Sequence, residues 1–290
     1  MRYSLPPWAG FLFFFILGTQ AFGAPVAPSE LDRKVNALLG KMTLDEKIGQ
    51  MVQYNHWATA SLEAKDDLAR GRVGSFLNTV GAKDTNELQK IAVEQSRLHI
   101  PLLFGLDVIH GYKTIFPIPL AEDCAFNPGL LTQCEAVAAR EASAAGVRWT
   151  FAPMVDVTRE PRWGRIAEGS GEDPYLGSIL AAARVRGFQG SSLADPGSIA
   201  ACAKHYVGYG AVEAGREYNT TNISDLDLWN LHLPPFQAAA DAGARTFMSA
   251  FNDLNGVPAS GNRRTLRDIL KGQWAFQGFV VSDWDSVEEL

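Results

Sequence analysis

The sequence has few cysteines and no residue spacing typical of a metal site. Its 290 residues contain three cysteines, Cys124, Cys134 and Cys202, which form neither paired zinc ligands nor a disulfide-dense framework. We predict buried thiols, although one pair could form a bridge in an oxidising compartment. Because no set of His, Asp and Glu residues has ligand spacing either, we expect no metal and no organic cofactor.

The sequence also lacks an excess of positive charge and a membrane-spanning apolar run. Its net charge of −6 argues against nucleic acid or an anionic membrane surface as a partner. The apolar run Trp8–Leu17 is about half of the roughly 20 residues that a membrane span needs. With Arg2 before it and the small residues Ala21 and Gly23 after it, this run is typical of a secretory signal peptide. We therefore predict a signal peptide over 1–23, export to the periplasm or the medium, and no membrane attachment after cleavage; a membrane anchor is the alternative.

No repeat or low-complexity linker interrupts residues 24–290, which we interpret as one domain. Apolar, strand-like runs alternate there with helical patterns. The strand-like runs are Val73–Leu77, Leu102–Leu106, Trp149–Ala152, Ile199–Ala203, Thr246–Phe251 and Phe279–Val281. The helical patterns are Thr85–Leu98, Leu130–Ala145, Pro174–Phe188, Leu226–Ala242 and Thr265–Lys271, and Thr43 with Glu46 forms a capping box before another helix.

This alternation predicts an α/β fold with a parallel sheet, because each crossover between parallel strands needs about a dozen residues. An open, doubly wound sheet would usually carry a glycine-rich phosphate turn after its first strand, and none follows Leu77. A (β/α)8 TIM-type barrel is therefore favoured. Only about six of its eight strands are visible, so we expect the barrel to be incomplete at its C-terminus.

Polar side chains follow the predicted strands at the point where each strand ends. In a parallel barrel these ends meet at one rim, where active sites are built. The residues at these ends, in chain order, are Asp107, Asp156, Arg165, Lys204, His205, Asn252 and Asp283. Carboxylates, cations and aromatic rings without a metal set suit a neutral, polyhydroxylated ligand, and a carboxylate can attack an anomeric carbon.

Five ordered strings carry a resemblance to a known family. They are FGLDVIHG (104–111), PRWGRIAEGSGEDPYLG (161–177), ACAKHYVGYG (201–210), TFMSAFNDLNGVP (246–258) and GFVVSDW (278–284). From about Leu31 to Leu290 the chain resembles glycoside hydrolase family 3, and in detail the bacterial periplasmic β-glucosidases of that family. The resemblance implies retaining hydrolysis of small β-glucosides or oligosaccharides, with the aspartate of the SDW motif, Asp283, as nucleophile.

The same resemblance assigns sugar-binding roles to further residues. It implies that Asp107, Arg165, Lys204 and His205 hold sugar hydroxyls, that Met248 and Phe251 line the pocket, and that Trp284 forms a wall beside the nucleophile. Phe251 stands where many relatives have tyrosine. Simpler interpretations remain open: Asp283 could cap a following helix, Asp107 could only shape a turn, and Lys204 and His205 could be an internal pair.

The acid/base carboxylate is not evident in the sequence. In the glucosidase branch it is a glutamate on a domain that follows the barrel, so we expect it outside this chain and expect the isolated chain to show little turnover. The β-N-acetylhexosaminidase branch instead uses the last histidine of a KHFPGHG pattern. Here the sequence reads KHYVGYG with Tyr209 at that position, so this branch is disfavoured.

Three further alternatives stay open at this point. The chain could be a β-xylosidase, or an inactive fragment that only binds sugar. A sugar-binding transport protein is less compatible with the pattern, because such proteins have two lobes of open sheet.

Overall fold

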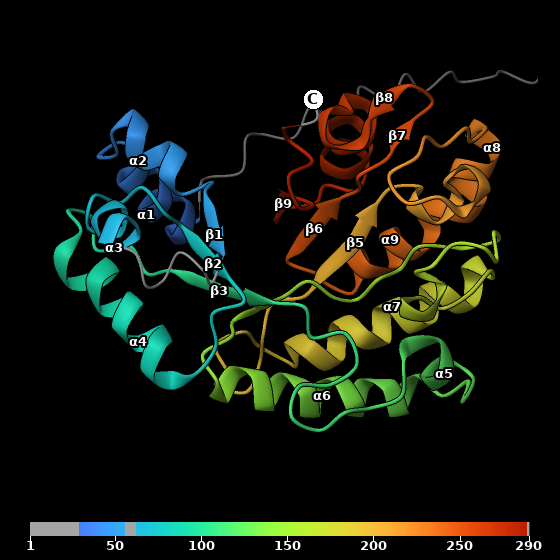
Figure 1. Ribbon diagram of the computed structural model, residues 1–290, viewed down its shortest axis with the longest axis horizontal. Helices are drawn as coiled ribbons and strands as arrows, with labels where there is room; N and C mark the ends of the chain where they lie inside the picture. Colours follow the sequence, from blue (N-terminus) through green and yellow to red (C-terminus); the bar gives the residue numbers. More distant parts are fainter. Residues whose placement is uncertain (1–28, 56–61, 289) are drawn as a thin grey trace, which may run out of the picture. The chain divides into compact units, whose positions relative to one another are not determined.

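The computed structural model describes residues 29–55, 62–288 and 290 (Figure 1). The predicted signal peptide, residues 1–23, lies outside the described residues. The chain divides into two compact units, Met1–Met42 and Thr43–Leu290. In the first unit the structure describes one helix, α1 (Glu30–Leu39), which begins at a capping box formed by Ser29 and Asp32.

The second unit is built on parallel strands separated by helices, as the alternation predicted. The parallel strands are β1 (Gln53–Asn55), β2 (Ser75–Leu77), β3 (Leu103–Leu106), β4 (Trp149–Thr150), β5 (Cys202–Tyr206), β6 (Thr246–Ser249) and β9 (Phe279–Ser282). They pair in the orders β1-β2-β3-β4 and β5-β6-β9. Parallel bridges from Trp149 to Ala200 and from Met154 to Lys204 connect the chain at β4 to the chain at β5. A short antiparallel hairpin, β7 (Asp253–Leu254) and β8 (Val257–Pro258), follows β6.

The strands follow one another in space in the order of the sequence, and this order distinguishes the two architectures. A doubly wound sheet reverses direction at a switch point, whereas a TIM-type barrel adds every strand on the same side of the one before. The fold is therefore of the TIM-barrel type, as predicted. Within the described residues β1 and β9 are the outer strands and do not pair with each other.

All six predicted strands are present, and β1 is an additional strand that the sequence did not reveal. Its three residues, Gln53, Tyr54 and Asn55, contain no apolar run, yet they pair in register with Ser75, Phe76 and Leu77. The parallel strands described thus number seven rather than about six. Asp283 follows the seventh of them.

The predicted helices are confirmed, with ends that follow local capping. The helices of the second unit are α2 (Leu44–Gly49), α3 (Leu62–Ala69), α4 (Ala82–Lys90), α5 (Pro119–Asp123), α6 (Pro128–Ala144), α7 (Pro174–Gln189), α8 (Asp225–Asp227) and α9 (Leu233–Asp241). Wider helical turns cover Ile91–Gln95, Leu228–His232 and Arg264–Gln273. Thr43 and Glu46 form the expected capping box at α2, and Asp173 accepts a hydrogen bond from the Leu176 N–H at the start of α7.

Apolar side chains pack on both faces of the strands. Outside, Phe188, Phe236 and Phe247 belong to a large cluster between the strands and the helices α6, α7 and α9; α6 and α7 lie below the strands in Figure 1. Inside, Trp149 contacts Phe151 with ring centroids 4.6 Å apart, and its indole N–H donates to the Thr246 hydroxyl at 2.8 Å. Burial on both faces explains why most of the strands could be found as continuous apolar runs.

Gly105 on β3 is required by this inner packing. A Cβ atom at this position would lie 2.8 Å from the ring of Phe151, closer than van der Waals contact allows. The glycine lets the ring lie directly against the strand that ends at Asp107.

Helices α5, α6 and α7 share a buried ionic cluster around Arg184. Its guanidinium donates to Glu122 at 2.9 Å, to Asp123 at 2.8 Å and to Glu135. Burial, and the neighbouring Glu122 and Asp123, raise the pKa of Glu135 to about 8 in spite of the arginine. This upward shift favours the protonated form of Glu135, which reduces the charge that the helices bury.

The three cysteines are free. The prediction of buried thiols is correct for Cys202 but wrong for Cys124, which is exposed on the last turn after α5. In the ranges that the structure describes, no helix is long and apolar enough to cross a membrane.

Candidate active site

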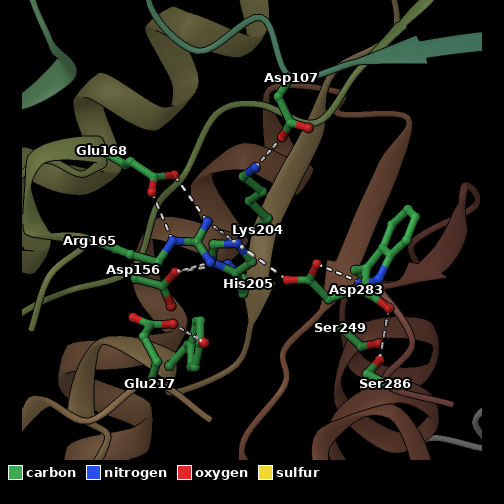
Figure 2. Close-up of polar contacts among 12 residues, drawn as sticks. Asp107, Asp156, Arg165, Glu168, Lys204, His205, Glu217, Ser249, Asp283 and Ser286 are labelled. Atoms are coloured by element: carbon green, nitrogen blue, oxygen red, sulfur yellow. Dashed lines mark hydrogen bonds and ion pairs between the residues drawn. The ribbon is translucent and has the colours of Figure 1, made fainter. Parts of the chain in front are cut away.

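The polar residues at the strand ends converge on one cavity of about 1630 Å³ in the second unit. Side chains from the ends of β3, β5, β6 and β9 and from the loop after β4 line it. Of the predicted site residues, those that line it are Asp107, Arg165, Lys204, Met248, Asp283 and Trp284. Figure 2 shows how the polar members of this site point toward one another.

Asp107 and Lys204 form one side of the site. The Lys204 ammonium lies 2.6 Å from Asp107 Oδ1, although 97 residues separate the two in the sequence. The lysine side chain is 4% exposed and the aspartate 45% exposed. Asp107 thus keeps one carboxylate oxygen and much of its surface open to the cavity, while the Lys204 ammonium balances its charge.

Arg165 is held from two directions. Its Nε and Nη2 donate to the two carboxylate oxygens of Glu168 at 2.8 and 3.1 Å, and Nη2 also lies 3.0 Å from His205 Nε2. The guanidinium outweighs burial and lowers the pKa of Glu168. Glu168 thus pairs with Arg165, whereas Arg162 pairs with Glu160 at 2.6 Å.

His205 is fully buried behind the cavity and is oriented by Asp156. The Asp156 Oδ2 atom accepts hydrogen bonds at 2.9 Å from the His205 backbone N–H and from Nδ1. Burial raises the pKa of Asp156 to about 7; burial and the nearby Arg165 and Lys204 cations lower the pKa of His205 well below its usual range. The Lys204–His205 peptide bond is cis.

Asp283 lies where β9 ends, and its two carboxylate oxygens have different surroundings. Oδ1 accepts a hydrogen bond from the Trp284 backbone N–H at 2.7 Å. Oδ2 is buried, has no hydrogen-bond donor in the structure, and lies 3.5 Å from His205 Nε2. Burial raises the pKa of Asp283 to about 6, against the opposing effect of the Trp284 N–H and of the Lys204 and Arg165 charges.

A chain of serine hydroxyls braces the turn that carries Asp283. Ser249 Oγ lies 2.8 Å from Ser260 Oγ, which lies 2.9 Å from Ser286 Oγ, and Ser286 donates to the Asp283 carbonyl at 3.1 Å. The Asp283 N–H itself donates to the Ser249 carbonyl at 3.2 Å. The end of β6, the loop after the β7–β8 hairpin and the nucleophile candidate are thereby tied together.

The arrangement therefore offers one carboxylate oxygen with no donor beside two cations and an indole ring. A group of this kind can attack an electrophilic carbon, while Arg165, Lys204 and Asp107 can bind vicinal hydroxyls. Within the described ranges no three His, Cys, Asp or Glu side chains are placed to bind a metal ion.

A family model decides the class of the chain. The Glycosyl hydrolase family 3 N terminal domain matches residues 43–290. The chain belongs to glycosyl hydrolase family 3.

Similar family 3 proteins include a "Periplasmic beta-glucosidase" of Salmonella typhimurium, 44% identical over 276 residues that cover 94% of this chain and 36% of the relative. A "Beta-xylosidase" of Formosa agariphila is 35% identical over 90% of this chain and 33% of its own length. Among solved structures, a β-glucosidase from Listeria innocua in complex with isofagomine superposes with a TM-score of 0.83 at 43% identity, covering 89% of this chain and 37% of that chain. The chain thus spans little more than a third of the length of these relatives.

Tyr209 distinguishes this chain from the hexosaminidase pattern of family 3. The tyrosine is buried; its ring packs edge-on against His205 at 5.2 Å, lies 5.7 Å from the Arg165 guanidinium, and its hydroxyl donates to Glu217. A phenol packed in this way supports the neighbouring cation and imidazole. The other oxygen of Glu217 is buried without a partner.

Two predicted residues do not line the cavity. Phe251 packs against Tyr218, which lines the cavity, with ring centroids 4.9 Å apart, and against the buried Tyr209. His205 is 1% exposed and does not line the cavity itself; it lies next to Arg165 and Asp283, which do. Conversely, the sequence did not identify Asp156, Ser260, Ser286 or Glu217 as site residues. Of these four residues, only Asp156 was recognised in the sequence as lying at a strand end, where it is the first carboxylate, but it was given no role in the site.

Proposed function

We propose that this chain is the catalytic barrel portion of an exported, retaining β-glucosidase whose nucleophile is Asp283. The observation that carries this proposal is the Asp283 carboxylate in the cavity lining, with one oxygen fixed by the Trp284 N–H and the other buried without a donor. The relatives named as β-glucosidases support the substrate class. A Listeria innocua enzyme of this kind has been solved with glucose, and a mutant with laminaribiose.

In the first half of the proposed reaction, the Asp283 carboxylate attacks the anomeric carbon as the bond to the aglycone breaks. The transition state resembles an oxocarbenium ion, and its positive charge faces the carboxylate. A group with a pKa raised to about 6 is largely ionised at neutral pH but poorly solvated, so it loses little hydration when it attacks. Lys204 and Arg165 keep the ionised form accessible.

The sugar is held by the groups around the nucleophile. Asp107 accepts hydrogen bonds from hydroxyls, Lys204 and Arg165 donate to them, and the exposed indole of Trp284 forms a wall. Met248 also lines the cavity. His205 and Phe251 do not line it and support the residues that do. In the second half of the reaction water attacks the glycosyl ester, so that the configuration at the anomeric carbon is retained.

We further propose that the acid/base carboxylate comes from a part of the enzyme beyond this chain. The relatives are nearly three times as long as the region that matches. Among the carboxylates that line the cavity, Glu168 is paired with Arg165, which lowers its pKa and makes it a poor proton donor, and Asp107 is paired with Lys204.

Export to the periplasm completes the proposal. It rests on the signal-peptide pattern at residues 1–23 and on the periplasmic relative from Salmonella typhimurium.

The test is hydrolysis of aryl β-glucosides by the full-length enzyme that contains this barrel portion, followed by proton NMR of the sugar first released. We expect the β-anomer of glucose to appear before mutarotation produces the α-anomer. First release of α-glucose, or hydrolysis only of an α-linked or N-acetylated substrate, would refute the proposal.

A xyloside is the matched second substrate, because the β-xylosidase relative leaves that specificity open. Xylose lacks only the hydroxymethyl group of glucose. Faster turnover of the xyloside than of the glucoside would keep the mechanism and change the substrate.

A further inference from the structure

Asp156 accepts two hydrogen bonds from His205. The carboxylate follows β4 and is 3% exposed, and its Oδ2 lies 2.9 Å both from the His205 backbone nitrogen and from Nδ1. The backbone contact fixes the position of the residue, and the side-chain contact fixes the direction of the ring.

The two ring nitrogens of His205 face opposite kinds of partner. Nδ1 faces a carboxylate oxygen, which accepts, so Nδ1 must carry the proton. Nε2 lies 3.0 Å from Arg165 Nη2; a guanidinium nitrogen can only donate, so Nε2 must accept. Both contacts select the same neutral tautomer, and the low pKa of this buried histidine, beside Arg165 and Lys204, agrees with it.

This tautomer matters because Nε2 is also the ring nitrogen nearest to Asp283. It lies 3.5 Å from Oδ2, the carboxylate oxygen that has no donor. An imidazole with its proton on Nε2 would donate toward that oxygen and occupy one of its lone pairs. With the proton on Nδ1, His205 presents a lone pair instead.

We propose that Asp156 is a positioning residue that fixes His205 as the neutral Nδ1–H tautomer and so keeps Asp283 Oδ2 free of a histidine donor. The catalytic meaning of this arrangement rests on the proposed nucleophilic role of Asp283. The tautomer itself does not depend on that role. His205 consequently contributes no N–H donor to the cavity, in contrast to its neighbours Arg165 and Lys204, which line it.

The direct test is a long-range proton–nitrogen NMR spectrum of the full chain labelled with ¹⁵N-histidine. The chain has five histidines, and the signals of His205 are those that disappear in His205→Gln. We expect a protonated Nδ1 and an unprotonated Nε2 that do not change across about pH 5.5–7.5, where an exposed histidine titrates. A proton on Nε2, or on both nitrogens, overturns the proposal.

Variants of Asp156 then separate positioning from simple structural support. Asp156→Asn keeps an acceptor oxygen and should retain the single tautomer. Asp156→Ala removes the contact that fixes the direction of the ring, so the ring can turn away from Arg165 and should show a mixture of tautomers. Asp107→Asn removes a carboxylate of the same cavity that does not contact His205, and should leave the His205 spectrum unchanged. If Asp156→Ala keeps the single tautomer, Arg165 alone fixes the ring and the proposal fails.

If Asp156→Ala does not fold, the wild-type and Asp156→Asn spectra still decide, because both must show the Nδ1–H form. The spectrum requires no turnover. A full-length enzyme that has this tautomer but no β-glucosidase activity would contradict the proposed function and not this inference. An active full-length enzyme with a proton on Nε2 would contradict this inference and not the proposed function.

Discussion

Two regions of the molecule bury an arginine among carboxylates, and they use it differently. Around Arg184 the guanidinium and its partners Glu122, Asp123 and Glu135 are at most 5% exposed. Around Arg165 the side chain is 23% exposed, and its partner Glu168 is 26% exposed. The first cluster joins three helices and lines no part of the cavity; the second lines it.

The comparison shows that an unsatisfied buried carboxylate oxygen does not by itself identify an active site. Asp123 Oδ2 and Asp283 Oδ2 are both buried without a donor. Only Asp283 lies at a cavity, beside an indole and within reach of two cations. Access for a ligand, rather than burial or charge, separates the reactive carboxylate from the structural one.

The largest expected effect is on turnover. Asp283→Asn removes the proposed nucleophile and should lower the rate of aryl β-glucoside hydrolysis by about 10⁴-fold or more. Glu135→Gln removes a buried carboxylate from the other cluster and should change the rate by no more than about twofold. Steady-state kinetics of the two variants compare the regions directly, and comparable losses would contradict the distinction.

The next largest effect is on stability, and here the Arg184 cluster should matter more than the cluster around Arg165. Arg184→Met leaves three carboxyl groups in the protein interior without a cation and should lower the free energy of unfolding by about 3–5 kcal/mol. Arg165→Met leaves Glu168, which can turn toward solvent, and should cost about 1 kcal/mol. Urea denaturation measures both. An Arg165 variant as unstable as the Arg184 variant would show that the two clusters are equally structural.

A smaller effect depends on pH. The pKa of Asp283 is raised to about 6 in the folded state, so the folded state binds this proton more tightly than the unfolded state. The associated stability is present below about pH 4 and is lost as the pH rises through 6. Asp283→Asn should therefore be more stable than the wild type by on the order of 2 kcal/mol at pH 7, with the difference vanishing near pH 4.

Thermal unfolding of both proteins across this pH range measures that difference. A gain of equal size at pH 4 and pH 7 would mean that the carboxylate is not destabilised by burial. In that case the contrast between a reactive and a structural carboxylate would lose its electrostatic basis.

The smallest effect concerns the serine chain beneath Asp283. Ser260→Ala breaks the hydroxyl contacts to Ser249 and Ser286 and should lower the free energy of unfolding by about 1 kcal/mol. It should also slow turnover, because the turn that holds the nucleophile is less constrained. Ser178→Ala on α7 removes one hydroxyl contact to the Pro174 carbonyl and is the matched control. Equal turnover in the two variants would exclude a bracing role.

Much of the fold could be predicted because the strands are buried on both faces. Apolar runs such as Leu102–Leu106 and Thr246–Phe251 stand out in the sequence, and polar residues directly after them mark the strand ends. The strand β1 was missed for the same reason, since Gln53, Tyr54 and Asn55 are held by pairing with β2 rather than by an apolar run.

The site could be predicted residue by residue but not contact by contact. Asp107, Lys204 and Asp283 were expected at one rim because strand ends converge there. The ion pair between Asp107 and Lys204, which are 97 residues apart, depends on side-chain packing that no local pattern encodes. The same is true of the packing of Phe251 against Tyr209 and Tyr218. The Arg184 cluster was not predicted, since its residues lie on three helices and only the fold brings them together.

The most direct test of the central claim is covalent trapping of the nucleophile. A 2-fluoroglucoside with a dinitrophenolate leaving group needs no proton donor to form the glycosyl ester, so the reaction isolates the role of Asp283 from that of the acid/base group. Mass spectrometry of the digested protein should find the fluoroglucosyl group on the peptide that contains Asp283, and none in Asp283→Asn. A label on Asp285, Glu217 or any other residue would contradict the assignment of Asp283 as the nucleophile.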